Sequence, residues 1–112
     1  MNIRERIQSY QSEILAGNLL PVRASEILTE LSALLGNISE EIMQRDVAYN
    51  KVLLSYLEVE KSANRAKIKS DITPEYEAMR TARNAEKVAV EMIRSLKYLL
   101  KAQQEEFRQS NN

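Results

Sequence analysis

Apolar residues recur every seven positions through the middle of this sequence, in two parallel rows. One row consists of Leu28, Leu35, Ile42, Tyr49, Tyr56 and Ala63. The other consists of Leu31, Ile38, Arg45, Val52, Val59 and Ala66, in which Arg45 replaces the expected aliphatic residue. This spacing is typical of helices that bury one stripe against a neighbouring helix. It predicts a long helix over residues 22–70.

A second apolar stripe follows the segment Asp71-Ile72-Thr73-Pro74 and predicts a long helix over residues 74–109. Thr73 is a favourable N-cap, and Pro74 is well suited to the first helical position. A turn here would fold the two helices into an antiparallel hairpin. If both helices are unbroken, Ala66 should lie near Ala78 and Tyr49 near Leu96.

A short amphipathic helix is expected at the N-terminus, over residues 2–16. Ile3, Ile7, Tyr10 and Ile14 are spaced so that they share one helical face. Gly17 should end this helix, since glycine is the usual residue just past a helix C-terminus. The apolar face would then cover the bulky open end of the hairpin, either in the same chain or in a partner.

Gly36-Asn37 allows two interpretations of the helix over residues 22–70. Asn37 with Glu40 resembles a capping box, and Gly36 could be a C-cap, so the helix could be bent or broken here. The heptad phase nevertheless continues from Leu35 to Ile42 without a slip. A glycine inside a helix costs only about 1 kcal/mol relative to alanine, so full continuity stays open.

The composition fits an all-α protein and argues against most enzyme classes. Of 112 residues, 44% are hydrophobic, and there are only two Gly and two Pro. The chain has no Cys and no His, which removes thiol nucleophiles, Cys/His zinc sites and the commonest general base. We expect one domain spanning residues 1–112, with no enzymatic activity and no cofactor. No apolar run is long enough to cross a membrane, and the N-terminus does not resemble a secretory signal, so a cytoplasmic location is expected.

A hairpin of two long helices leaves apolar surface uncovered, and this predicts an interaction function. A second copy is the simplest partner, giving a dimeric helical bundle, and a different protein is also possible. Arg45 could extend its stem over apolar neighbours, or it could meet an acidic residue of a partner and fix the register. The expected interface residues are Ile3, Ile7, Tyr10, Leu31, Leu35, Ile38, Arg45, Leu100 and Phe107.

Charge is unevenly distributed along the chain, although the net charge is zero. Residues 1–60 contain 5 Lys/Arg against 9 Asp/Glu, whereas residues 61–87 contain 7 against 4. The basic residues of the second segment would gather at the hairpin turn, where they could pair with the acidic segment or contact nucleic-acid phosphates. They are Lys61, Arg65, Lys67, Lys69, Arg80, Arg83 and Lys87. Tyr76 is the only aromatic residue nearby for base stacking, so nucleic-acid binding is the second choice.

Residues 40–108 resemble small helical proteins of phages and prophages. The resemblance is carried by Ala63-Asn64-Arg65-Ala66-Lys67, Arg80-Thr81-Ala82 and Ile93-Arg94-Ser95-Leu96-Lys97. These proteins are short helical hairpins, many without an assigned function and some encoded near recombination or replication genes. The resemblance implies a phage accessory protein, which could also act as an inhibitor of a host protein. It carries no diagnostic motif from which a functional residue could be assigned.

Overall fold

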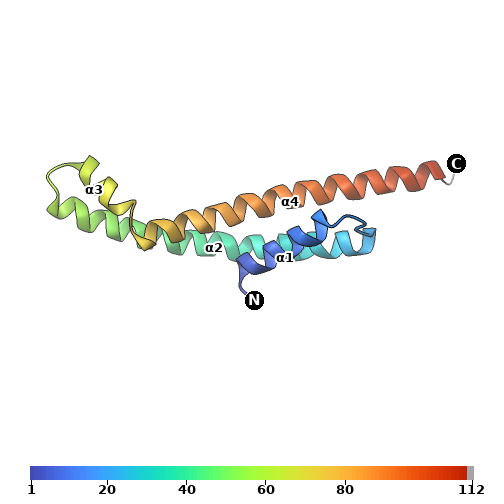
Figure 1. Cartoon of the computed structure of the whole chain (residues 1–112), viewed down its shortest axis with the longest axis horizontal. Coiled ribbons are helices and arrows are strands. Elements are labelled where there is room, and N and C mark those ends of the chain that lie inside the picture. The colour runs from blue at the N-terminus through green and yellow to red at the C-terminus, as the bar shows by residue number, and fades with distance from the viewer. Residues whose placement is uncertain (111–112) are drawn as a thin grey trace. The chain divides into compact units, whose positions relative to one another are not determined.

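The computed structural model describes residues 1–110, and over this range the chain is all-α, as predicted. It contains α1 (Ile3–Leu15), α2 (Pro21–Val59), α3 (Ala63–Ser70) and α4 (Pro74–Ser110), with no strand among the described residues (Figure 1). Within the same range, none of the helices combines the length and the apolar character that a membrane crossing requires.

Helix ends follow the local chemistry of the sequence. The Asn2 side chain caps α1 by accepting from the backbone N–H of Glu5. Gly17 and Asn18, both with positive φ, reverse the chain after Leu15. Pro21 opens α2, and Pro74 opens α4 with the Thr73 hydroxyl accepting from the backbone N–H of Tyr76.

Helix α2 passes through Gly36-Asn37 without interruption. Gly36 lacks the positive φ of a left-handed cap, unlike Gly17. The sequence left open whether the helix is continuous or is bent or broken at Gly36-Asn37, and in the structure it is continuous there.

The helix predicted over residues 22–70 is interrupted at a point that the heptad pattern does not mark. Helix α2 ends at Val59, and α3 begins at Ala63. Ser62 has an extended backbone, and its side chain accepts from the backbone N–H of Arg65, so it is the N-cap of α3. Lys69 of α3 forms an ion pair with Glu60 across this break. The expectation of a helix reaching Ser70 was therefore wrong, because a serine cap supplied a helix start without glycine or proline.

Contacts along the chain fall into two compact units, and both long helices contribute to each. Unit 1 comprises Met1–Gly36 and Lys87–Asn112, and the structure describes it as far as Ser110. It brings together α1, the first part of α2 and the second part of α4. Its buried apolar side chains are Ile7, Ala24, Ile27, Leu31, Leu34, Ala89, Met92 and Leu96.

Unit 2 comprises Asn37–Glu86 and contains the rest of α2, all of α3 and the start of α4. Its buried residues are Ile38, Tyr49, Ala66, Ser70 and Ala82. The rings of Tyr49 and Tyr76 pack with their centroids 5.5 Å apart. Arg83 Nη2 contacts both carboxylate oxygens of Asp46, at 3.0 and 2.9 Å.

The observed partners correct the pairing expected for an unbroken hairpin. Tyr49 was expected to face Leu96, but it packs on Tyr76 and donates its hydroxyl hydrogen bond to Asp71. The pairing of Ala66 with Ala78 likewise assumed that residues 63–70 continue α2. Since α3 is a separate helix, a constant register cannot be carried through the turn.

Candidate protein-binding groove

Arg23 fastens α1 to α2 within unit 1. Its Nε and Nη2 atoms donate to the two carboxylate oxygens of Glu13, at 2.9 and 2.7 Å. Its Nη1 atom donates to Glu26 at 3.1 Å. The donation from Arg23 holds the pKa of the Glu13 carboxyl below its ordinary value, and the same contact raises the pKa of Arg23.

Tyr10 adds a second contact between α1 and α2. Its hydroxyl donates to the Glu30 carboxylate, which raises the pKa of Tyr10 above its ordinary value. The Arg23 guanidinium carbon lies 6.0 Å from the centre of the Tyr10 ring. Helix α1 is thus held by the buried Ile7 and by polar contacts at its edge, and it covers its own chain.

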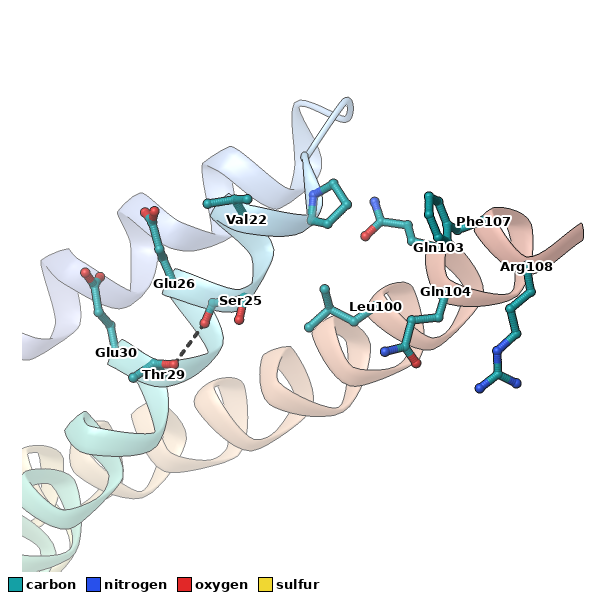
Figure 2. Close-up of a pocket in the computed structure, with 11 residues that line it drawn as sticks. Val22, Ser25, Glu26, Thr29, Glu30, Leu100, Gln103, Gln104, Phe107 and Arg108 are labelled. Atoms are coloured by element: carbon teal, nitrogen blue, oxygen red, sulfur yellow. Dashed lines mark hydrogen bonds between the residues drawn. The ribbon is translucent and has the colours of Figure 1, made fainter. Parts of the chain in front are cut away.

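A groove of about 1200 Å³ lies between the first turns of α2 and the last turns of α4 (Figure 2). Val22, on one wall, is 72% exposed, and Phe107, on the other, is 70% exposed. Leu100 also lies on the α4 wall. The remaining lining residues are Pro21, Ser25, Glu26, Thr29, Glu30, Gln103, Gln104 and Arg108. The groove therefore has an apolar lining, acidic residues on the α2 side and Arg108 on the α4 side.

Gln103 joins α4 to the segment before α2 at one end of this groove. Its Nε2 atom donates to the backbone carbonyl of Leu19 at 3.1 Å. Its Oε1 atom is buried and accepts no hydrogen bond from residues 1–110. The amide N–H of Gln103 thus ties α4 to the segment that precedes α2, while its amide oxygen accepts no hydrogen bond from the described residues.

The nine expected interface residues do not form one surface. Ile7, Leu31 and Ile38 are buried within the chain, so they are core residues and cannot contact a partner in this structure. Ile3, Tyr10 and Leu35 are half-buried. Of the remaining three, Leu100 and Phe107 line the groove, whereas Arg45 lies outside it. The sequence missed Val22, because this residue lies off the heptad rows.

Arg45 lies on an exposed part of α2, although it belongs to an apolar row. Its Nε atom is 3.8 Å from Glu41 of the same helix. The contact has the spacing of an i,i+4 pair on a helix surface, which contributes only a few tenths of a kcal/mol. Arg45 is therefore satisfied locally in this chain.

The seven basic residues of the expected nucleic-acid surface are distributed between the two units, six in unit 2 and Lys87 in unit 1. Acidic partners occupy three of them: Lys67 binds Asp71, Lys69 binds Glu60, and Arg83 binds Asp46. Arg80 lies 5.8 Å from the centre of the Tyr76 ring. Lys61 and Arg65 are exposed beside the break between α2 and α3. The ion pairs reduce the positive charge that this surface offers to phosphates.

Within residues 1–110, no three acidic side chains lie close enough together to hold a metal ion. Comparison with protein-family models, with curated proteins and with solved structures finds no match to this chain. The candidate site therefore rests on its own geometry, an open apolar groove between two helices.

Proposed function

We propose that this chain is a non-enzymatic, self-associating helical protein that acts by binding a helix of another protein in the groove of unit 1. The observation that supports it is the exposure of Val22 and Phe107 on opposite walls of one apolar groove (Figure 2). Soluble proteins seldom leave apolar side chains grouped in this way unless a partner covers them. Aromatic residues, Phe among them, are also enriched in protein interfaces.

The size and the apolar lining of the groove suggest the chemistry of its occupant. A volume of about 1200 Å³ exceeds the roughly 300–1,000 Å³ of typical small-molecule sites. An amphipathic helix with apolar anchors at i, i+3 or i+4, and i+7 is a common occupant of a long apolar groove. The charged residues that line the groove already have partners within the chain: Glu26 pairs with Arg23, Glu30 accepts from Tyr10, and Arg108 lies 3.7 Å from Glu105. Recognition of the occupant would therefore rest on the apolar lining.

The test places a photo-crosslinking phenylalanine analogue at position 107 and expresses the chain in the cells that normally make it. The same analogue at Tyr98 is the matched control, since Tyr98 is an exposed aromatic of α4 outside the groove. We expect a protein adduct specific to position 107, with the crosslink on a helical segment. Adducts of equal yield at both positions, or none at position 107, would contradict the proposal.

The segment identified in this way is then synthesised and titrated against purified variants by fluorescence anisotropy. Phe107→Glu should weaken binding at least tenfold, and Tyr98→Glu should leave it unchanged. A peptide that binds Phe107→Glu as tightly as the unmodified chain would exclude the groove as its site.

Nucleic-acid binding through the basic residues of unit 2 is the alternative function. It predicts association with single- or double-stranded DNA at about 50 mM salt, weakened by added salt because phosphate contacts release counterions. It also predicts loss of binding on changing Arg65 and Arg83 to Glu. An origin in phage, inhibition of a host protein and a cytoplasmic location stay predictions from the sequence.

A further inference from the structure

A second apolar stripe runs along α2 within unit 2, on side chains that the chain itself leaves exposed. Met43 is 62% exposed, Val47 49%, Leu54 57% and Leu57 42%. With Asn50 included, the positions 43, 47, 50, 54 and 57 advance by alternating steps of four and three. This alternation is that of the a and d positions of a coiled coil. We call these five residues the outer seam.

The outer seam differs from the stripe that α2 uses for its own fold. The buried Ile38 and Tyr49 lie in the two heptad rows that predicted the helix, and none of the five seam residues belongs to those rows. The seam is also short, covering two heptads. An isolated helix of that length would be marginal in water, but here α2 is already ordered by its packing. Association would therefore not have to meet the cost of forming the helix.

Asn50 identifies the partner that the seam fits. An apolar stripe on another protein would bury the Asn50 amide without hydrogen bonds, which is costly. In a parallel, in-register pair of this chain, Asn50 of each copy would meet Asn50 of the other, and the two amides could bond. The register-fixing role established for a polar residue belongs to an Asn at an a position, whereas the spacing of the seam places Asn50 at a d position. Asn50 therefore supports self-pairing through the hydrogen bond that the two amides could form.

Charges beside the seam favour the same arrangement. With Val47 and Leu54 at a positions, Asp46 occupies a g position and Lys51 the following e position. In a parallel dimer, Asp46 of one copy would face Lys51 of the other, twice. An antiparallel pair centred on Asn50 would instead set the two Lys51 side chains against each other. Asp46 already receives Arg83, but its side chain is still partly exposed and a carboxylate can accept further donors.

We infer that the outer seam is the surface through which two copies of this chain form a parallel, in-register dimer. The inference rests on the self-association contained in the proposed function, but it does not depend on the groove. The seam lies wholly in unit 2 and the groove wholly in unit 1. An experiment can therefore disprove the seam as a dimer surface without disproving the groove as a binding site, and the reverse.

The first experiment measures mass by light scattering as a function of concentration, up to high micromolar. The unmodified chain should approach twice its 12.9 kDa mass. Leu54→Glu should stay a monomer, or dimerise at least tenfold more weakly, with unchanged helicity by circular dichroism. Ile72→Glu is the matched control, since Ile72 is exposed in the same unit but off the seam, and it should dimerise normally.

Three results would overturn the inference. A strictly monomeric unmodified chain removes self-association altogether. A dimer that Leu54→Glu does not weaken, but that Phe107→Glu does, would move self-association to the groove. A dimer weakened equally by Leu54→Glu and Ile72→Glu would show that the effect is not specific to the seam.

The orientation can be tested directly because the chain contains no cysteine. Under mild oxidation, Leu57→Cys alone should form a disulfide dimer rapidly, since a parallel pair brings the Cα atoms of position 57 in the two copies within bonding range. Mixing Met43→Cys with Leu57→Cys should give no excess of the mixed dimer. A mixed dimer that forms faster than either self-dimer would establish an antiparallel pair and overturn the arrangement.

Discussion

Units 1 and 2 draw on the same two long helices but bury very different side chains. The buried set of unit 1 is mainly aliphatic and includes Ile27, Leu31 and Leu96. That of unit 2 contains small residues, Ala66, Ser70 and Ala82, beside one aliphatic residue and one tyrosine. Both units add polar contacts between their elements, such as Arg23 with Glu13 in unit 1 and Arg83 with Asp46 in unit 2. The comparison teaches that one helix can serve two kinds of packing along its length.

The difference extends to what each unit exposes. Unit 1 exposes apolar side chains in a groove between two helices, where another helix could bind. Unit 2 leaves an apolar stripe on the outer seam of a single helix, apart from the isolated exposed residues Val59, Ile68 and Ile72. A groove suits insertion of a foreign helix, whereas a convex stripe suits a matching stripe. We therefore expect the stability of unit 1 to depend mainly on its aliphatic core, and the stability of unit 2 to respond to protein concentration.

The largest expected effect comes from a substitution in the aliphatic core of unit 1. Leu96→Ala should lower the free energy of unfolding by about 2–5 kcal/mol, because it removes a buried side chain and leaves a cavity. Urea denaturation followed by circular dichroism measures it. Leu20→Ala, at an exposed leucine of the same unit, is the control and should change stability little. Equal losses for the two variants would contradict the assignment of Leu96 to the core.

The next effect concerns the small buried residues of unit 2. Ala66→Leu should lower the free energy of unfolding by about 1–3 kcal/mol, because the fully buried Ala66 site has no space for a larger side chain. Ala63→Leu, at the exposed start of the same helix, should be close to neutral. If Ala66→Leu proved stabilising, unit 2 would be loosely packed, and the contrast between small and aliphatic cores would fail.

The polar contacts of unit 2 are tested by Tyr49→Phe, which keeps the ring on Tyr76 but removes the hydroxyl donated to Asp71. The expected loss is about 0.5–1.5 kcal/mol near pH 7. Donation from Tyr49, and then from Lys67, holds the pKa of the Asp71 carboxyl below its ordinary value. Their contribution is thus fully present above the unfolded pKa of about 3.9 and is lost as pH falls through the folded pKa.

The difference in urea midpoint between the unmodified chain and Tyr49→Phe should therefore shrink on acidification below about pH 4. At the alkaline end, the pKa of Tyr49 is raised above 10.0, mainly by its bond to Asp71. The contribution of this hydrogen bond to stability is fully present below pH 10, the unfolded pKa of a tyrosine, and is lost as pH rises through the raised pKa of Tyr49 in the folded chain. Leu96→Ala serves as the control, because its loss should not follow either titration. A difference independent of pH would show that the bond to Asp71 contributes nothing.

The smallest expected effect comes from a substitution at Gly36, on the boundary between units 1 and 2. Gly36 is the last residue of unit 1 before unit 2 begins, and it lies inside α2. Apart from its chain neighbours and the adjacent backbone of its own helix, a Cβ added there would meet nothing within 4 Å. Gly36→Ala should raise the free energy of unfolding by about 0.4–1 kcal/mol, because alanine restricts the unfolded chain. Thermal unfolding measures it.

Gly17→Ala provides the matched contrast, since Gly17 has a φ of +79°. Alanine is strained in that region, by roughly 1–2 kcal/mol. The two glycine variants should therefore have opposite signs. A destabilising Gly36→Ala would mean that α2 is interrupted at this residue after all.

Much of the fold could be predicted from local signals. The N-cap Thr73 with Pro74 fixed the start of α4, and Gly17 marked the reversal after α1. The break after Val59 was missed, because Ser62 is a weak cap signal inside a strong heptad pattern. Of the groove, Leu100 and Phe107 were anticipated, whereas Val22 lies off the rows and could not be selected.

The outer seam shows where sequence reasoning stops. Its spacing of fours and threes was present in the sequence, but the longer rows through Tyr49 had the same period and more members. A heptad pattern states that a helix has an apolar stripe; it does not state which of two stripes its own chain will cover. That choice was made by Tyr76, Asp71 and Arg83, which are distant in sequence.

The sequence by itself determined that the chain is helical, where α1 and α4 begin, and that Cys and His chemistry are absent. These properties follow from composition and from contacts within a few residues. Only the tertiary structure decided where α2 ends, which residues line the groove and which stripe of α2 faces solvent. These three features depend on contacts between segments far apart in the chain. The local sequence pattern does not indicate which of several possible partners each helix face will contact.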